Sequence, residues 1–301
     1  MKRKRVGEEG RFQIFGNIIM ILFSLAAVIP LVLLLISSFT DDSALVRNGY
    51  SFFPEKWSAY AYQYIFTSGN SLTRAYIMSF VLTAVGVVVG LAITTLLAYG
   101  LSKKFLPARG VITFLVVFTM LFNGDLVPTY MNYANVFKVK DTFFGLLLPG
   151  LLMNAFNVMM MKSYFVSGVP DEILEAAYID GANEYQTFLK IAFPLAKPIV
   201  ATIALFIGIG YWNDWMNGYV YLSKATHLYT IQNLLNRMMQ NIQFLQQNSS
   251  TISGANTGLA SIPAVSVRMA MAVCGILPIV VIYPFIQNNF VKGITLGGVK
   301  G

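Results

Sequence analysis

Side chains able to carry out covalent chemistry are scarce in this sequence. His227 is the only histidine and Cys274 the only cysteine, and the boundary of an apolar segment separates them. A zinc site takes several such ligands, and a Cys–His nucleophile needs both groups in contact. There is also no Gly-x-x-x-x-Gly-Lys-Ser/Thr loop, the pattern that holds nucleotide phosphates. We therefore expect no catalytic residue, no metal and no bound cofactor in this chain.

The residues best suited to binding a ligand lie together at the end of an apolar segment. The run Tyr211-Trp212-Asn213-Asp214-Trp215 combines aromatic rings with amide and carboxylate groups. A sugar presents an apolar C–H face and a rim of hydroxyl groups, which these two kinds of side chain bind. We interpret Asn213 and Asp214 as facing a polar path, with capping or bracing of an interrupted helix as the alternative. The aromatic residues fit an interfacial aromatic belt equally well.

Three further polar residues lie within or beside apolar segments. Asn154 and Asn157 are three apart and would share one face of a helix, where they either line the path or bond to a neighbouring helix. We favour the interhelical bonds. Asp125 with Pro128 is expected to end a span at the outer surface, with direct contact to a substrate as the alternative.

A charged loop between two apolar blocks, residues 167–197, has the pattern of two short helices. The first is expected to stop at Gly181, a residue suited to a left-handed turn. Asn183 and Gln186 have the spacing of a capping box, so a second helix should begin there and run to about Ile191.

The first of these helices carries an apolar face on a loop that should lie in water. Ile173, Leu174, Ala177 and Tyr178 fall on that face by their spacing. The same segment is acidic, through Glu172, Glu175, Asp180 and Glu184. Acidic side chains suit an anionic lipid surface poorly, so we expect the face to dock on a partner protein rather than on the membrane.

The elements that must position these residues are apolar and helical. Of 301 residues, 56% are hydrophobic and 11% charged, whereas soluble domains have about 25% charged residues. The stretches without Asp, Glu, Lys or Arg include residues 12–40, 75–102, 142–161 and 269–291. Each is long enough to cross about 30 Å of hydrocarbon as a helix, and two shorter blocks, 110–124 and 198–213, bring the count to six. We therefore predict an all-α, polytopic membrane protein of one domain, residues 1–301, with spans at about residues 12–38, 75–101, 110–131, 143–161, 198–221 and 269–290.

The basic residues indicate how the spans are oriented. Segments 1–11, 103–109, 162–197 and 292–301 hold 13 Lys and Arg in 64 residues, and the alternate segments hold 8 in 106. Cytoplasmic loops carry the excess of Lys and Arg, so both termini and the loop 167–197 are expected in the cytoplasm. The first apolar run is about twice as long as the core of a signal peptide, and we interpret it as an uncleaved first helix.

The long external loop, residues 222–266, combines two kinds of sequence. An amphipathic stretch at about residues 231–245 is expected to lie on the membrane, and the Gly/Ser/Asn-rich tract 248–258 should be flexible.

The loop 167–197 also carries a specific motif. It reads Glu175-Ala176-Ala177, three residues, Gly181, nine residues, Ile191, one residue, Phe193-Pro194. This resembles the EAA loop of bacterial ATP-binding-cassette (ABC) importer permeases, with Phe193 where that pattern has leucine. The fuller sugar-importer version, with Asp180-Gly181-Ala182 and Phe188, is present as well.

Other stretches resemble the maltose-permease branch of carbohydrate importers, particularly members from Gram-positive bacteria that serve complex oligosaccharides. These are residues 122–130, 211–215 and the tail from 290 to 301. The resemblance implies the type I importer permease fold in a bacterial cell membrane. It also implies a second permease subunit, two ATPase subunits that bind ATP and Mg, and an extracellular solute-binding protein that meets the external loops.

The resemblance assigns roles to two groups of residues. The first short helix of the loop would sit in a cleft of an ATPase subunit and transmit its closure to the spans. The coupling residues would be Glu175, Ala176, Ala177, Asp180, Gly181, Ile191 and Pro194, and the tail Val299, Lys300 and Gly301 would reach between the ATPases. We therefore predict the permease subunit of an oligosaccharide importer. The alternatives are an importer of a non-sugar solute and a stand-alone secondary transporter.

Overall fold

The computed structural model describes residues 2–67, 70–122, 124–247 and 264–298. These residues form helices and one isolated β-bridge, between Thr40 and Trp57. The chain divides into two compact units, one made of residues 1–69 with 238–277 and the other of residues 70–237 with 278–301. Two helices, α14 (Ile231–Gln247) and α16 (Ala264–Gly298), contribute to both units.

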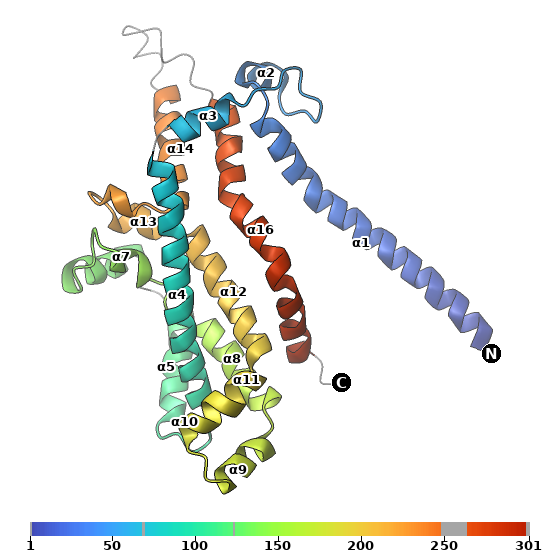
Figure 1. The fold of residues 1–301 in the computed structure, drawn as a ribbon, viewed down its shortest axis with the longest axis vertical. Coiled ribbons are helices and arrows are strands. Elements are labelled where there is room, and N and C mark those ends of the chain that lie inside the picture. Colours follow the sequence, from blue (N-terminus) through green and yellow to red (C-terminus); the bar gives the residue numbers. More distant parts are fainter. Residues whose placement is uncertain (1, 68–69, 123, 248–263, 299–301) are drawn as a thin grey trace. The chain divides into compact units, whose positions relative to one another are not determined.

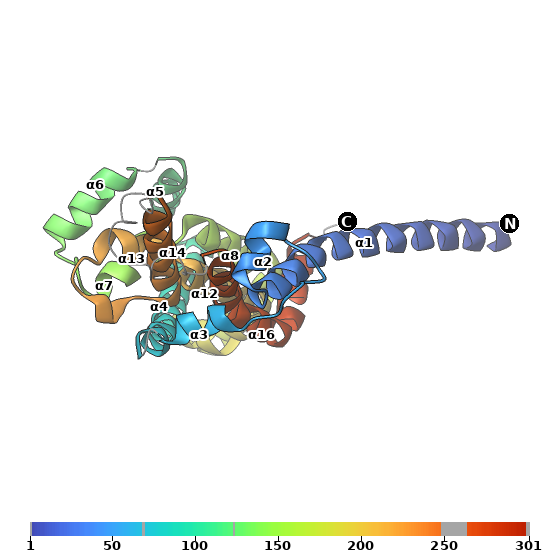
Figure 2. The same ribbon diagram turned by 90° about the horizontal axis from the view of Figure 1, so that it is seen from above.

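The second unit is built around α4 (Asn70–Ser102), which packs against α8 (Ala155–Gly168) and α12 (Lys197–Asn213) (Figure 1; Figure 2). The helix α5 (Arg109–Leu121) lies against α8. A glycine allows one close approach between α4 and α12: a Cβ atom at Gly86 would lie 2.2 Å from the ring of Tyr211. The Tyr211 hydroxyl, buried in this contact, donates a hydrogen bond of 2.8 Å to the Leu147 carbonyl. The tyrosine therefore joins α12 both to α4 and to the segment before α8.

The remaining elements of the second unit are short. They are α6 (Leu126–Met131), η1 (Asn132–Val136), α7 (Phe144–Leu147), α9 (Asp171–Ile179), α10 (Glu184–Thr187), η2 (Phe188–Ala192), α11 (Phe193–Leu195), α13 (Met216–Tyr221) and η3 (Thr226–Leu228).

The first unit contains α1 (Lys2–Ser38), α2 (Asp42–Asn48) and α3 (Tyr60–Thr67). No residue in the most apolar 18-residue part of α1 is buried in the chain. Its apolar side chains point in all directions and are expected to contact lipid or another protein. The Asp42 carboxylate accepts hydrogen bonds of 2.9 Å from the backbone N–H groups of Val265 and Ser266. It thereby satisfies two of the free donors at the start of α16.

Three helical segments are long and apolar enough to cross a membrane: Phe12–Ser38, Ser71–Ser102 and Val265–Pro284. Two bent pairs of helices bring the number among the described residues to as many as five. One of these pairs turns by 79° between Glu184–Leu195 and Lys197–Asn213. The multi-pass, all-helical architecture is as predicted, and the count of six spans stays a prediction.

Three predicted spans are not continuous helices. The expected helix 110–131 ends at Leu121, the expected helix 198–221 stops at Asn213 and resumes at Met216, and the expected helix 143–161 is divided into α7 and α8. In each later helix, an N–H group of the first turn bonds to an acidic or amide side chain just before the helix, namely that of Asp125, Asn154 or Asp214. Such a side chain satisfies backbone N–H groups that a continuous helix would pair internally.

The external loop also departs from expectation at its amphipathic part. The stretch is helical, as α14, but Ile231 and Leu235 are buried in the second unit, and the Ile231 N–H donates to the Ser79 hydroxyl at 2.8 Å. Its first turns therefore pack on protein and not on a membrane surface. The tract 248–258 lies outside the described residues.

Candidate functional site

The helix α9 of the charged loop divides its apolar side chains between two directions. Leu174 and Ala177 are buried within the chain, whereas Ile173 and Tyr178 remain partly exposed. Half of the predicted apolar face therefore completes the core of the chain itself, and docking of the other half on a partner stays a prediction. Two large side chains that the sequence analysis did not select are more exposed: Ile179 at 86% and Tyr185 at 71%.

The turn after α9 has the predicted conformation. Gly181 has φ +83°, a value that side chains with a Cβ atom adopt only with strain. The N–H groups of Gly181 and Ala182 donate back to the carbonyls of Tyr178 and Ala177, at 3.0 and 2.9 Å. These bonds satisfy the last carbonyl groups of α9. No described atom of the chain lies within 4 Å of a Cβ built at Gly181, so the space beside the turn is open.

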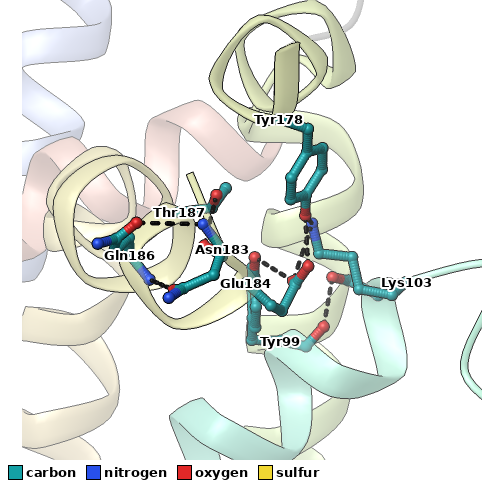
Figure 3. Close-up of polar contacts among 8 residues, drawn as sticks. Tyr99, Lys103, Tyr178, Asn183, Glu184, Gln186 and Thr187 are labelled. Atoms are coloured by element: carbon teal, nitrogen blue, oxygen red, sulfur yellow. Dashed lines mark hydrogen bonds and ion pairs between the residues drawn. The ribbon is translucent and has the colours of Figure 1, made fainter. Parts of the chain in front are cut away.

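The second helix of the loop begins with the predicted capping box (Figure 3). The Gln186 N–H donates to Asn183 Oδ1 at 2.9 Å, and the Asn183 N–H donates to Gln186 Oε1 at 3.1 Å. The helical path does not stop at about Ile191 as expected. The chain passes through the π-helical segment η2 into α11, where Pro194 occupies the first turn and its missing N–H removes no needed hydrogen bond.

The structure brings most of the predicted coupling residues to the surface of one loop. Exposed are Glu175, Ala176, Asp180, Gly181 and Pro194, while Ile191 is half-buried and Ala177 is buried. Four of the exposed members, Glu175, Ala176, Asp180 and Gly181, lie in α9 or the turn after it, and Ile179 adds a large exposed apolar side chain to them. This surface, residues 175–181, combines small residues, carboxylates and one exposed aliphatic chain, which suits contact with a protein.

The run 211–215 serves the fold more than the sequence analysis expected. Tyr211 and Trp212 are buried, and the Trp212 ring lies 5.1 Å from that of Phe80. Asp214 Oδ1 accepts hydrogen bonds from the N–H groups of Met216 and Asn217, at 3.1 and 3.2 Å. Asp214 thus braces an interrupted helix, which was the alternative. Its Oδ2 atom is buried with no hydrogen-bond partner among the described residues.

The two asparagines do not share a helix face as predicted. Asn154 precedes α8 and its Oδ1 accepts a hydrogen bond of 3.2 Å from the N–H of Asn157, whose side chain is buried. Asn154 is exposed and lies on a cavity of about 800 Å³. Asp125 is exposed, has φ +59° and accepts a hydrogen bond from the Leu126 N–H at 2.7 Å.

The cavity beside Asn154 has an aromatic lining that the sequence analysis missed. Tyr133 and Phe137 line it with ring centroids 5.7 Å apart, and Phe156 and Thr119 also contribute. The spacing of four between Tyr133 and Phe137 is the only signal that the sequence offered, and it indicates no more than a shared helix face. A second cavity, of about 450 Å³, is apolar and lies between α4, α12 and the second part of α16, beside Trp212.

A further carboxylate joins two segments that are far apart in the chain. Asp141 Oδ1 accepts hydrogen bonds from the backbone N–H groups of Ser223, Lys224 and Ala225, at 2.7, 2.7 and 3.1 Å. The N–H groups of Lys224 and Ala225, followed by that of Ser223, hold the pKa of this carboxyl below its usual value. Asp141 therefore fixes the segment after α13 to the segment before α7.

Two sets of predicted residues add nothing to this geometry. The tail Val299, Lys300 and Gly301 lies outside the described residues. Within the ranges that the structure describes, no three His, Cys, Asp or Glu side chains come close enough to hold a metal ion.

Comparison with known proteins gives consistent matches over nearly the whole chain. A family model described as "Binding-protein-dependent transport system inner membrane component" matches residues 7–296. The polygalacturonan/rhamnogalacturonan transport system permease protein YtcP of Bacillus subtilis is 34% identical over 96% of this chain and 97% of its own length. Protein LplC of the same organism is 33% identical over 91% and 90%. A solved structure of a bacterial ABC transporter that imports the acidic polysaccharide alginate has a TM-score of 0.76 and 28% identity, covering 93% of this chain and 96% of that one.

Proposed function

The chain belongs to the family of inner membrane components of binding-protein-dependent transport systems, and on this premise we propose that it is a permease subunit of an ABC importer for oligosaccharides. The observation that carries the sugar class is the pair of full-length similarities, to a permease named for polygalacturonan and rhamnogalacturonan and to an alginate importer. The chain itself performs no covalent chemistry in this proposal.

The surface 175–181 is the proposed docking site for an ATPase subunit, which binds and hydrolyses ATP with Mg. Support comes from its geometry: Glu175, Ala176 and Gly181 are exposed together, and the space beside the Gly181 turn is open. Small residues allow a partner's backbone to approach closely, and an exposed aliphatic side chain such as Ile179 gains free energy when a partner covers it. By the distribution of Lys and Arg, this surface and both chain termini lie in the cytoplasm.

A second permease subunit and an extracellular solute-binding protein complete the proposed assembly. The most apolar part of α1 is not buried within the chain. This helix must therefore contact lipid or other subunits, which is consistent with a larger membrane assembly. Asn213 and Trp215, which are exposed, stay candidates for the substrate path, and the cavity with Asn154, Tyr133 and Phe137 joins them. An amide beside aromatic rings suits the hydroxyl groups and the C–H faces of sugars.

Purification of the complex in detergent, followed by mass analysis and transport assays in proteoliposomes, tests the proposal. We expect this chain to purify with a second permease and an ATPase dimer. Uptake of an oligosaccharide should require ATP and the binding protein. A chain that purifies alone and moves solute down an ion gradient would contradict the proposal, and an ATP-driven complex that accepts only non-sugar solutes would overturn the substrate class.

A further inference from the structure

We propose that Tyr99, Lys103, Tyr178 and Glu184 form a clamp that holds α9 to the loop-side end of α4, so that a displacement of α9 is passed on to α4. This set of four residues is called the Glu184 clamp below. The inference rests on the proposed function for the source of the displacement, the ATPase. The clamp itself is a property of this chain alone.

One carboxylate joins three helices in the clamp (Figure 3). Glu184 is the first residue of α10, directly after the capping residue Asn183. Its Oε2 atom accepts a hydrogen bond of 2.5 Å from the Tyr178 hydroxyl, in the last turn of α9. Its Oε1 atom accepts a hydrogen bond of 2.7 Å from the Tyr99 hydroxyl, near the end of α4. Hydrogen bonds to an ionised acceptor are shorter and stronger than those between neutral groups.

The ammonium group of Lys103 lies inside the same cluster. Its Nζ atom is 3.5 Å from Glu184 Oε1 and donates to the Tyr178 hydroxyl at 3.2 Å. It also lies 4.6 Å from the centroid of the Tyr99 ring and 5.6 Å from that of Tyr178. Only 11% of the Lys103 side chain is exposed, so its charge depends on these partners in place of water.

The balance of interactions keeps the carboxylate ionised. Burial raises the pKa of Glu184, but the hydrogen bonds from Tyr178 and Tyr99 and the charge of Lys103 together hold that pKa below its usual value. Near neutral pH the carboxylate therefore stays in the form that accepts both tyrosine hydroxyl groups.

On the side of α4, the clamp is anchored in the core of the second unit. Tyr99 is buried, and its ring packs against Phe165 of α8 at 5.4 Å and against Phe188 of η2 at 4.8 Å. A pull on the Tyr99 hydroxyl therefore acts on packed side chains and not on a mobile surface group.

The clamp matters because the other polar links of α9 are weak or permissive, and the burial of Leu174 and Ala177, which also holds this helix, is not directional. Gly181 separates α9 from α10, and the open space around it would let α9 pivot at this turn. The other ion pair between α9 and the end of α4, Lys104–Asp171, spans 3.7 Å with side chains that are 87% and 72% exposed. Exposed pairs of this kind contribute little to holding two elements together. The Glu184 clamp, in which Tyr99 and Lys103 are largely buried and the Glu184 side chain is 45% exposed, is the polar tie that opposes pivoting.

Transport stoichiometry tests whether the clamp transmits movement. In the complete complex in proteoliposomes, we expect Glu184→Gln and Tyr178→Phe to lower the substrate transported per ATP hydrolysed by about five- to tenfold, the scale of a typical coupling between sites. Lys103→Met should also lower the substrate transported per ATP hydrolysed. Lys103→Arg, which keeps the charge and the hydrogen-bond donors, should keep most of the wild-type ratio. The matched control is Lys104→Met, which removes the adjacent but exposed ammonium and should leave the ratio within about twofold.

A distance measurement tests the clamp without transport. Spin labels are placed at Leu96 on α4 and Glu172 on α9, both exposed, in a Cys274→Ala background of the complex. The distance distribution should be narrow in the parent and in Lys104→Met, and clearly broader in Glu184→Gln. The proposal requires both results: normal stoichiometry in Glu184→Gln and Tyr178→Phe overturns it, and so does an unchanged distribution. If the parent complex moves no sugar, the proposed function fails, and the label pair still decides whether the clamp holds α9.

Discussion

Two carboxylates of the second unit each join segments that are far apart in the chain, but they use different donors. Asp141 is bound by three backbone N–H groups of residues 223–225, whereas Glu184 is bound by the hydroxyl groups of Tyr99 and Tyr178. Backbone donors cannot turn away without changing the course of the chain. The exposed side chains of Tyr178 and Glu184 can change partners through rotation alone, whereas the Tyr99 ring is packed in the core. The Asp141 contact thus suits a rigid connection between two segments. The Glu184 contact suits a connection that transmits movement and can rearrange.

The largest effect should come from replacing Gly181, in the turn between α9 and α10 that the Glu184 clamp bridges. Gly181→Val places a β-branched residue at φ +83°, which costs about 1–3 kcal/mol of strain, and displaces α9 from α10. We expect transport and substrate-stimulated ATP hydrolysis to fall by more than about tenfold, which matches a loss of about 1.4 kcal/mol or more of coupling free energy. Both are measured on the purified complex.

Gly49→Val is the matched control for this change, because Gly49 has φ +73° and open space around it but ends α2 in the first unit. It should lower the melting temperature and leave the transport stoichiometry intact. Wild-type transport in Gly181→Val would remove the loop from the coupling route.

Asp141→Ala should lower the thermal stability of the chain without changing the coupling between transport and ATP hydrolysis. Removing the carboxylate leaves three backbone N–H groups without their acceptor, and a hydrogen bond to a charged group contributes about 1.5–3 kcal/mol. We expect the melting temperature in detergent to fall by several degrees, with an unchanged ratio of transport to ATP hydrolysis. A coupling defect without a stability loss would reverse the roles assigned to Asp141 and Glu184.

The pH dependence of this effect has a defined sign. The pKa of Asp141 is lower in the folded chain than its ordinary value of 3.8, so its stabilising contribution is present above that value. The contribution is lost as the pH falls through the lowered folded pKa. The difference in melting temperature between wild type and Asp141→Asn should therefore shrink below about pH 4 and stay constant from there to neutral pH.

Asp214→Ala should have a smaller effect on stability, because it removes one capping side chain from α13. The expected cost is about 1 kcal/mol, and Asp214→Asn, which retains a capping oxygen, should lose less. Thermal unfolding in detergent measures both. Equal losses in the two variants would show that the carboxylate charge matters more than the cap.

A cysteine at the same position separates bracing from a role in the substrate path. In a Cys274→Ala background, we expect Asp214→Cys to react slowly with an external water-soluble thiol reagent, because Asp214 is half-buried and its Oδ2 atom is fully buried. Fast labelling whose rate changes during ATP turnover would instead place this position on the path.

Glu175→Ala should have the smallest effect of the series. The side chain is exposed and deforms no turn, so its loss should reduce substrate-stimulated ATP hydrolysis by less than about threefold. The measurement is the rate of substrate-stimulated ATP hydrolysis by the purified complex at two salt concentrations. A loss as large as that of Gly181→Val would show that this charge, and not the shape of the turn, dominates docking.

The sequence predicted the local features of the coupling loop well. The Asn183–Gln186 capping box and the Gly181 turn depend on residues within a few positions of each other, and the structure has both. The family and the all-helical, multi-pass fold were also predictable, because composition and a short motif indicate them.

The interruptions of the spans were not predictable. Hydropathy describes the mean polarity of a segment and does not indicate whether Asn154 or Asp214 faces a path or caps a helix. The Glu184 clamp could not be predicted for another reason. Tyr99 and Glu184 are 85 residues apart, and no local sequence pattern indicates that they are in contact. Long-range polar contacts of this kind depend on how the helices pack.

The contact between Gly86 and Tyr211 has a consequence for how sequences of this kind diverge. A methyl group at position 86 would lie 2.2 Å from the ring, and the ring is held in place by its hydrogen bond to the Leu147 carbonyl. A larger residue at position 86 requires a smaller residue at position 211. A smaller residue at 211 leaves the Leu147 carbonyl without its hydrogen-bond donor, so neither position can change freely alone. Related chains should therefore vary the two positions together, and a library that randomises both should yield functional pairs that neither single-site library contains.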